Sequence, residues 1–296
     1  MELNTLLQYK PYSTARTEKR ALYAGLLTGL TQFHRGRCPE YGRLLDALGC
    51  PAHMDCTVES TPMLPVSLFK ELELRSIPEG EVFKTITSSG TTGQRVSRIF
   101  LDGATSACQQ QALCQIMSDF LGERRLPFLV LDSRQVLRNR AMFSARGAGI
   151  LGFSIFGTRP CYALDEHMEL DLDGVRAFLE EHQGETIFLF GFTFIIWKHV
   201  VRALEERGER LDIPNGILVH GGGWKKLAGE AVSPGEFKAR VAAATGVERV
   251  SNYYGMAEQT GCIYMECPQG HLHASLWSDI VVRRGRDYRP CEPGEE

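Results

Sequence analysis

Three features that would fix the class of a protein at once are missing from this sequence. No apolar run approaches the ~20 residues that a membrane-spanning helix needs, and the nearest candidate, residues 187–196, is interrupted by Gly191. Neither sign of charge dominates, because 33 Lys and Arg face 36 Asp and Glu, and this balance excludes a general attraction to nucleic acid or to anionic membranes. Residues 1–20 contain no basic segment followed by an apolar one, so no secretion signal is predicted.

Cysteine is scattered rather than patterned. The nine cysteines run from Cys38 to Cys291 in a chain of 296 residues, an odd number without the spacing of a disulfide framework. We therefore expect reduced thiols and a cytoplasmic location. Hydrophobic residues at 43% and charged residues at 23% match ordinary globular proteins. The length suggests two domains, or one large α/β body with a smaller lobe.

Apolar runs and helical periods alternate after a mainly helical segment over residues 1–80. Strands are expected at residues 82–87, 98–101, 126–131, 186–190, 216–220, 247–253 and 280–283. Helices are expected at residues 104–121, 172–181, 194–207 and 234–244. This order predicts a layered α/β fold of mostly parallel strands with flanking helices. Sites in such folds form where loops leave the carboxyl ends of the strands.

The first of three unusual loops follows the strand expected at residues 82–87. It contains Ser88, Ser89, Gly90, Thr91, Thr92 and Gly93. Backbone amides in a glycine turn can converge on an anion and hydroxyl groups add donors, so the loop suits a polyphosphate. It is not a Walker A loop, because no Gly-Lys-Ser/Thr follows. A polar surface turn is the alternative.

The second loop, Gly221–Gly223, lies between His220 and Lys225. Three glycines let the backbone approach a flat or bulky group. A His-Gly-Gly-Gly run also forms the oxyanion hole of lipases, but the matching Gly-x-Ser-x-Gly motif is absent and a serine hydrolase is not favoured. His220 either orients a substrate or is a hydrogen-bonded core histidine. Lys225 or Lys226 either neutralises a carboxylate or α-phosphate or is a solvated side chain.

The third loop follows the strand expected at residues 247–253. Tyr254 beside Gly255 can stack on a base, and the carboxylate of Glu258 can hold Mg2+, which prefers oxygen ligands and substrate phosphates. Taken alone, an ordinary turn is the alternative interpretation.

Together, in this order and spacing, the three loops resemble the adenylate-forming enzyme superfamily, with Tyr254–Glu258 resembling its Tyr-Gly-x-Thr-Glu motif. Within it, further runs are most similar to the acyl-protein synthetase (LuxE) family. These runs are Leu64–Lys70, Ser97–Asp102, Gly222–Lys226 and the Gly-Met-x-Glu-Gln run ending at Gln259. The resemblance covers about residues 62–296. It implies the large N-terminal domain of an adenylate-forming enzyme.

The resemblance also implies a function. Ser88 to Gly93 would hold the β- and γ-phosphates of ATP, and Gly221–Gly223 would border the adenine. Tyr254 would stack on the adenine beside Gly255, and Glu258 would bind Mg2+. Lys225 and His220, beside the glycines, are expected to neutralise charge and orient the substrate. A fatty acid would be activated as acyl-AMP, then passed to a cysteine and on to an acyl-protein reductase or an acyl carrier.

Two positions depart from the superfamily pattern. Arg95-Val96 stands where many of its enzymes have Pro-Lys, so cationic help must come from Arg95 or Arg98. Ala257 stands where the motif has a Thr that contacts the α-phosphate. A lost hydrogen bond to a charged group is worth ~1.5–3 kcal/mol, so slower adenylation is expected unless Gln259 or Thr260 compensates.

Two other functions stay open. One is an acyl- or aryl-CoA ligase of the phenylacetate-CoA ligase type, which shares the three loops; the other is a nucleotide-binding module that has lost turnover. The superfamily continues past a Pro-Gly-Glu turn, such as the one ending at Glu295, into a Gly-Asp motif and a small lid with a catalytic Lys. We therefore expect residues 81–296 to form an ATP-binding adenylation domain that is incomplete at its C-terminus and lacks this lid domain, with residues 1–80 packed on it.

Two further patterns have both a functional and an ordinary interpretation. Cys262, Cys267, His271 and His273 are zinc-ligand types, but their spacing matches no common finger and a turn at residues 268–270 explains the region without metal. Aromatic residues also recur after residue 187. Phe188, Phe190, Phe192, Phe194 and Trp197 either line an acyl tunnel or, as is more usual, fill the core.

Overall fold

The structure is a computed structural model that describes residues 6–88, 95–138, 145–292 and 294–295. Two compact units make up the chain, and each is described by itself. Unit 1 comprises Met1–Ile116, Gly255–Ile263 and Ala274–Glu296, and unit 2 comprises Met117–Tyr254 and Tyr264–His273. The division expected at residue 80 stays a prediction.

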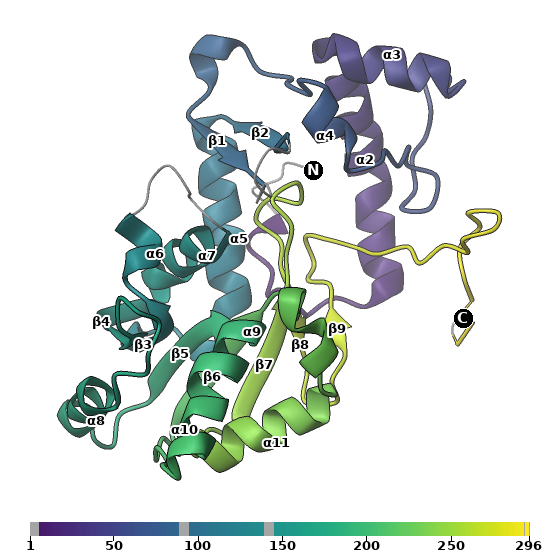
Figure 1. Cartoon of the computed structure of the whole chain (residues 1–296). Helices are drawn as coiled ribbons and strands as arrows, with labels where there is room; N and C mark the ends of the chain where they lie inside the picture. The colour runs from purple at the N-terminus through teal and green to yellow at the C-terminus, as the bar shows by residue number, and fades with distance from the viewer. Residues whose placement is uncertain (1–5, 89–94, 139–144, 293, 296) are drawn as a thin grey trace. The chain divides into compact units, whose positions relative to one another are not determined.

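Unit 2 is built on a seven-stranded sheet (Figure 1). Its spatial order is β4 (Gly157–Leu164), β3 (Leu126–Ser133), β5 (Ile187–Phe192), β6 (Gly216–Gly221), β7 (Arg249–Tyr254), β8 (Tyr264–Glu266) and β9 (Leu272–His273). The pairs from β4 through β7 are parallel, and the last two pairs are antiparallel. The mostly parallel sheet with flanking helices is therefore confirmed.

The central strands form because nearly every side chain on them is apolar. All six residues of β5 and all six of β6 are buried, as expected for strands covered on both faces. The aromatic residues of β5 pack within this core. Phe188 stacks on Phe128 with ring centroids 4.9 Å apart, and Phe190 stacks on Phe153 at 4.4 Å. Trp197 is buried as well, and its ring packs against those of Trp224 and Phe237.

Helices of unit 2 begin and end at recognisable signals. The carboxylate of Asp171 accepts the Gly174 N–H, 3.0 Å away, at the start of α8 (Leu172–Glu181). Ser233 caps α11 (Pro234–Thr245) in the same way. Further helical elements of unit 2 are α6 (Gln135–Arg138), α7 (Ala145–Phe153), η3 (Ser154–Phe156) and η5 (Lys225–Glu230).

The helix expected at residues 194–207 is interrupted. It comprises α9 (Thr193–Ile195), the π-helical segment η4 (Ile196–Val201) and α10 (Arg202–Arg207). Gly208, with φ of 64°, ends it in the left-handed region. Figure 1 shows α10 and α11 beside strands β6 and β7, and the ring of Phe237 on α11 lies 4.7 Å from that of His220 on β6.

In unit 1 the regular elements within residues 6–80 are helical, as expected for the first eighty residues. Its elements are α2 (Arg16–Arg37), α3 (Pro39–Ala47), α4 (Leu68–Glu71), η1 (Glu79–Glu81), β1 (Lys84–Thr87) and β2 (Arg98–Leu101), with α5 (Gly103–Leu121) running from unit 1 into unit 2. The strand expected at residues 280–283 was wrong, because that segment forms only an isolated bridge between Arg283 and Pro290.

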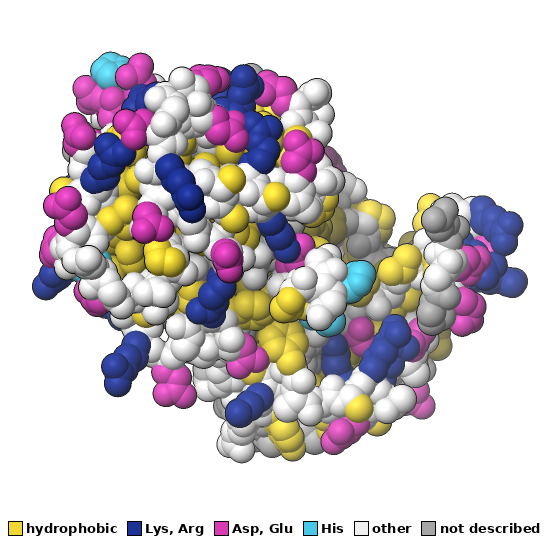
Figure 2. Space-filling model, turned by 90° about the horizontal axis from the view of Figure 1, so that it is seen from below, with side chains coloured by type: hydrophobic (Ala, Val, Ile, Leu, Met, Phe, Trp, Pro, Cys, Tyr) yellow, Lys and Arg dark blue, Asp and Glu magenta, His cyan; other side chains and the backbone are white. Residues whose placement is uncertain are grey.

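Positive and negative side chains are interspersed on the face that Figure 2 shows, in keeping with a net charge of −3. Among the described residues, no helix has both the length and the hydropathy to cross a membrane.

Candidate functional site

The glycine loop and Tyr254 stand at one edge of the sheet in unit 2. Gly221 ends β6, and the register pairs it with Tyr253 on the parallel neighbour β7. Gly222 and Gly223 are exposed, and Tyr254 is 49% exposed although it is a large ring at the end of a strand. Exposed backbone next to an exposed aromatic face is an arrangement that suits a flat ring.

Packing explains two of the three glycines. A Cβ atom on Gly221 would lie 2.5 Å from the ring of Tyr253. Gly222 has φ of +75°, and its Cβ would lie 2.9 Å from the ring of Phe192. A Cβ on Gly223 would meet nothing within 4 Å. Packing among the described residues therefore does not require a glycine at position 223.

His220 lies buried directly beneath this loop. Its Nδ1 is 3.0 Å from the hydroxyl oxygen of Thr193, while its Nε2 is buried and has no hydrogen-bond partner among the described residues. Burial, reinforced by the nearby charge of Lys238, lowers the pKa of His220 to about 3. The imidazole is therefore neutral at physiological pH and supplies no positive charge. The interpretation as a hydrogen-bonded core histidine describes this geometry.

A buried ion pair that the sequence did not suggest lies beside the same strand ends. Lys238 on α11 places its Nζ 3.0 Å from the carboxylate of Glu266 on β8, which is only 5% exposed. The same oxygen accepts the backbone N–H of Asn252 at 2.8 Å. This contact fixes β7 two residues before Tyr254. Lys238 and Glu266 lie on different elements, so no sequence motif links them.

The phosphate loop has a different setting from the one predicted. Of its residues only Ser88 is described; Ser89, Gly90, Thr91, Thr92 and Gly93 lie outside the described residues. β1 and β2 pair antiparallel, with Thr87 opposite Arg98. The Ser88 hydroxyl accepts the N–H of Ser97 at 2.9 Å, and the Ser88 N–H donates to the Ser97 carbonyl at 3.2 Å. The strand that precedes these residues therefore belongs to an antiparallel pair in unit 1 and is not a parallel strand.

Both arginines considered as substitutes for the missing Lys carry surface ion pairs. Arg95 lies 2.9 Å from the carboxylate of Glu71, and Arg98 lies 3.7 Å from that of Glu73. All four side chains are largely exposed. Exposed pairs of this kind are worth ~0–1 kcal/mol, so either guanidinium can leave its partner for a phosphate at little cost.

The structure gives the positions of the remaining predicted residues but not their roles. Gly255 and Glu258 belong to unit 1 and Tyr254 to unit 2. Glu258 is partly exposed in a turn in which the Gln259 N–H donates to the Met256 carbonyl at 3.2 Å. Lys225 begins η5; its side chain is not among the parts of the chain that the structure describes. The roles of these residues stay predictions.

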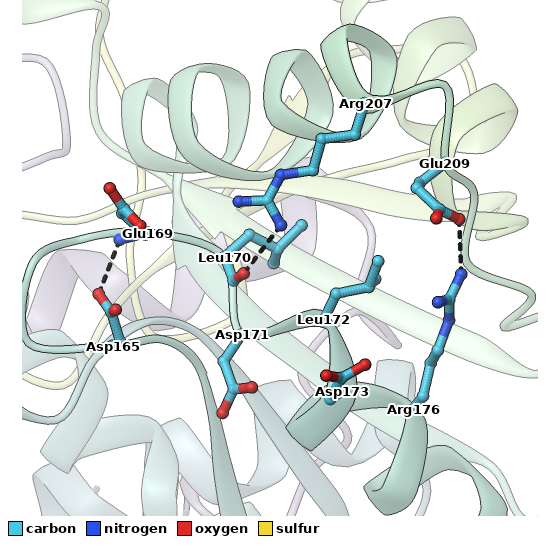
Figure 3. A pocket seen from close by; sticks show the side chains of 9 residues that line it. All are labelled: Asp165, Glu169, Leu170, Asp171, Leu172, Asp173, Arg176, Arg207 and Glu209. Carbon is cyan, nitrogen blue, oxygen red and sulfur yellow. Dashed lines mark hydrogen bonds and ion pairs between the residues drawn. The ribbon is translucent and has the colours of Figure 1, made fainter.

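A pocket of about 610 Å3 in unit 2 contains none of the predicted residues (Figure 3). It is lined by five carboxylates and two guanidinium groups, from Asp165, Glu169, Asp171, Asp173, Glu209, Arg176 and Arg207. Arg176 lies 2.7 Å from Glu209, and Arg207 donates to the Leu170 carbonyl at 3.2 Å. An excess of carboxylates repels a polyphosphate, so this pocket is not the ATP site that the sequence predicts.

The cysteine–histidine segment contains the predicted turn. The Gly270 N–H donates to the Cys267 carbonyl at 2.9 Å between β8 and β9. The Sγ of Cys262 lies 3.4 Å from the Trp277 carbonyl. Within the part of the chain that the structure describes, no group of three or more His, Cys, Asp and Glu side chains is arranged to hold a metal ion.

Comparison with known proteins identifies a family and several similar proteins, two of which are described below. The family model of the acyl-protein synthetases (LuxE) matches residues 2–296. The long-chain-fatty-acid–luciferin-component ligase of Vibrio harveyi is 22% identical over 233 residues, 77% of this chain and 59% of that protein. A crystal structure of 2-hydroxyisobutyryl-CoA ligase, in the postadenylation state with an acyl-AMP, is 15% identical at a TM-score of 0.60. That similarity in fold covers 97% of this chain and 59% of the ligase. The chain thus spans about three-fifths of the length of both proteins.

Proposed function

Because the chain belongs to the acyl-protein synthetase (LuxE) family, matched over residues 2–296, we propose that it activates a carboxylic acid with ATP. The reaction forms an acyl-adenylate and releases pyrophosphate. The acyl group then passes to a protein thiol and from there to a reductase. We propose a fatty acid as the substrate and the cytoplasm as the location.

The observation that carries the proposal is the edge of the sheet formed by β6 and β7. It places the exposed Gly222–Gly223 backbone and the exposed ring of Tyr254 at the ends of neighbouring parallel strands. Gly223 leaves open space where any other residue would carry a Cβ atom. These features fit an adenine ring, which needs a flat slot and backbone donors rather than charge.

The reaction needs no protein nucleophile. A carboxylate oxygen of the substrate attacks the α-phosphorus of ATP, the bond from that phosphorus to the bridging oxygen breaks, and pyrophosphate leaves with the bonding electrons. The protein contributes position and charge neutralisation. Bound Mg2+ neutralises phosphate charge, and the Glu258 carboxylate is an oxygen ligand of the type it takes. The hydroxyls and amides of Ser88 to Gly93 would hold the phosphates, and Lys225 would neutralise the carboxylate.

Both relatives support parts of this scheme. The Vibrio harveyi protein is named a long-chain-fatty-acid ligase, which favours a fatty acid here. The structurally similar ligase carries an acyl-AMP, which favours the adenylate. Because that protein is named a CoA ligase, an acyl- or aryl-CoA ligase is the second candidate.

Carboxylate-dependent exchange of labelled pyrophosphate into ATP tests the proposal. Exchange driven by a fatty acid supports it, and exchange driven only by an aryl acid favours the CoA ligase of the phenylacetate type. Adding CoA or a reduced acceptor protein afterwards shows which thiol receives the acyl group. A protein that binds ATP but exchanges no pyrophosphate with any acid would be a nucleotide-binding module, the outcome that Ala257 makes conceivable.

A further inference from the structure

We propose that Thr193 is a positioning residue for nucleotide binding: its hydroxyl holds two consecutive peptide groups of the glycine loop, and His220 fixes the direction of that hydroxyl as the Nδ1–H tautomer. The inference rests on the proposed function, because it assigns a role within the nucleotide site. All the groups involved lie in unit 2.

The geometry centres on a single oxygen atom. The Thr193 Oγ1 lies 2.9 Å from the Gly222 carbonyl oxygen, 3.2 Å from the Gly221 carbonyl oxygen and 3.0 Å from the His220 Nδ1. Thr193 and His220 are both buried, whereas Gly222 and Gly223 are exposed. Thr193 therefore lies on the protein side of the loop, and a ligand would approach from the other side.

The number of protons links the hydroxyl to the tautomer. A threonine hydroxyl has one proton to donate, and carbonyl oxygens can only accept. We assign this proton to the carbonyls, of which that of Gly222 is the nearer at 2.9 Å. The His220 Nδ1 must then donate to the hydroxyl oxygen, so the neutral ring carries its proton on Nδ1. Its Nε2 becomes an acceptor.

The unpartnered Nε2 of His220 agrees with this assignment. The opposite tautomer would place an N–H at Nε2, where the described part of the chain offers no acceptor. Buried N–H groups without a partner are rarer than buried acceptors without one. The opposite tautomer would also leave both carbonyls facing a hydroxyl oxygen whose proton points elsewhere.

Anchoring the carbonyls orients the amides of the loop. In a trans peptide the C=O and the following N–H point in opposite directions, and the described chain contains no cis peptide. The Gly221 and Gly222 carbonyls turn inward to Thr193, so the N–H groups of Gly222 and Gly223 point away from it. On this proposal, these two donors are available to an acceptor on the nucleotide. Without the hydroxyl the glycine peptides are free to rotate.

Calorimetric titration of ATP into matched variants tests the role of Thr193. Thr193→Val keeps the shape and removes the hydroxyl, so ATP should bind about fivefold more weakly or worse, the factor for one ordinary hydrogen bond. Thr193→Ser keeps the hydroxyl and should retain the wild-type affinity. Thr245→Val is the matched control: Thr245 is another buried threonine of unit 2, and its hydroxyl donates to the Val241 carbonyl at 2.7 Å. It should lower stability without changing the Kd for ATP.

Variants of His220 test the tautomer. The amide nitrogen of Asn reaches the position of Nδ1, so His220→Asn should retain ATP binding, whereas His220→Gln should lose it to the same extent as Thr193→Val. Nitrogen-15 NMR of the wild-type imidazole should show the proton on Nδ1. Each of these measurements is made on folded protein, verified by circular dichroism.

The outcomes separate the inference from the proposed function. Wild-type protein that binds no ATP would refute both. Wild-type binding with an unchanged Kd in Thr193→Val, or a proton found on Nε2 of His220, would refute the inference and leave the proposed function standing. An equal loss of binding in Thr193→Val and Thr245→Val would also refute it, because general destabilisation would then be the cause.

Discussion

Adding one methyl group at Gly221 tests how the glycine loop is built. In Gly221→Ala the new Cβ would lie 2.5, 2.8 and 2.9 Å from three ring atoms of Tyr253, whereas carbon atoms in contact normally lie ~3.5–4.0 Å apart. The ring cannot retreat easily, because its centroid lies 5.0 Å from that of Phe153 and 6.1 Å from that of Phe190. To relieve the contact, the ring of Tyr253 would have to move by about 1 Å and displace the aromatic rings packed against it.

Overpacking of this kind costs ~1–3 kcal/mol. Because the contact is with a confined ring, we expect the free energy of unfolding of Gly221→Ala to fall by about 2–3 kcal/mol. Urea unfolding followed by tryptophan fluorescence measures this. ATP binding should weaken too, since the same displacement shifts the end of β6.

Gly223→Ala, two residues further along the loop, is the control. Its Cβ would meet nothing within 4 Å, so its unfolding free energy should stay within about 0.5 kcal/mol of the wild type. ATP binding should nevertheless weaken, because the methyl group occupies the space proposed for the adenine. Equal stabilities of Gly221→Ala and wild type would refute the reasoning on packing. Unchanged ATP affinity in Gly223→Ala would contradict the assignment of this loop to the nucleotide.

Three further predictions concern charged and titratable groups. Glu258→Gln should reduce Mg2+-dependent pyrophosphate exchange by more than about a hundredfold, since a metal supplies several kcal/mol of charge stabilisation; near-normal exchange would remove its metal role. Lys238→Met should destabilise the protein by about 3 kcal/mol, because it leaves the buried carboxylate of Glu266 unpaired, and adding Glu266→Gln should restore part of the loss in urea unfolding. The pKa of His220 is lowered from 6.5 to about 3, so below pH 6.5 the unfolded chain binds a proton that the folded chain does not, and stability falls as the pH drops. Between pH 7 and pH 5 wild-type protein should lose about 2 kcal/mol more than His220→Asn; equal losses would contradict the buried neutral state.

The sequence predicted strands best where burial is complete. The apolar run at residues 126–131 appears as β3, whose residues after the first are all buried. A continuous apolar run is stable only where both faces of the strand are covered. Weakly patterned elements were missed. β4 carries several exposed or partly exposed residues, and β8 is only three residues long, too short to show a period.

Interruptions within elements were also beyond the sequence. The apolar spacing at residues 194–207 predicts a regular helix, but η4 is a π-helical segment that places Ile196, Trp197, Val200 and Val201 in the core. Tertiary packing, which local periodicity does not report, decides this geometry.

Within the candidate site, the residue types were visible and their connections were not. The glycines of the loop and Tyr254 stand out in the sequence as unusual. Thr193 does not, because a threonine after an apolar strand carries no signal of its own. Its contact with Gly222 arises because β5 and β6 are parallel neighbours, with Phe192 opposite Gly221. Only the fold brings Thr193 beneath the loop.

Equilibrium dialysis of the purified chain against labelled ATP and Mg2+ measures whether the chain binds the nucleotide. We predict saturable binding at one site, competed by AMP and weakened in Gly223→Ala, because the Gly221–Gly223 loop and Tyr254 would form the adenine slot. Folded protein that retains no ATP above background, or binding that Gly223→Ala leaves unchanged, would contradict it.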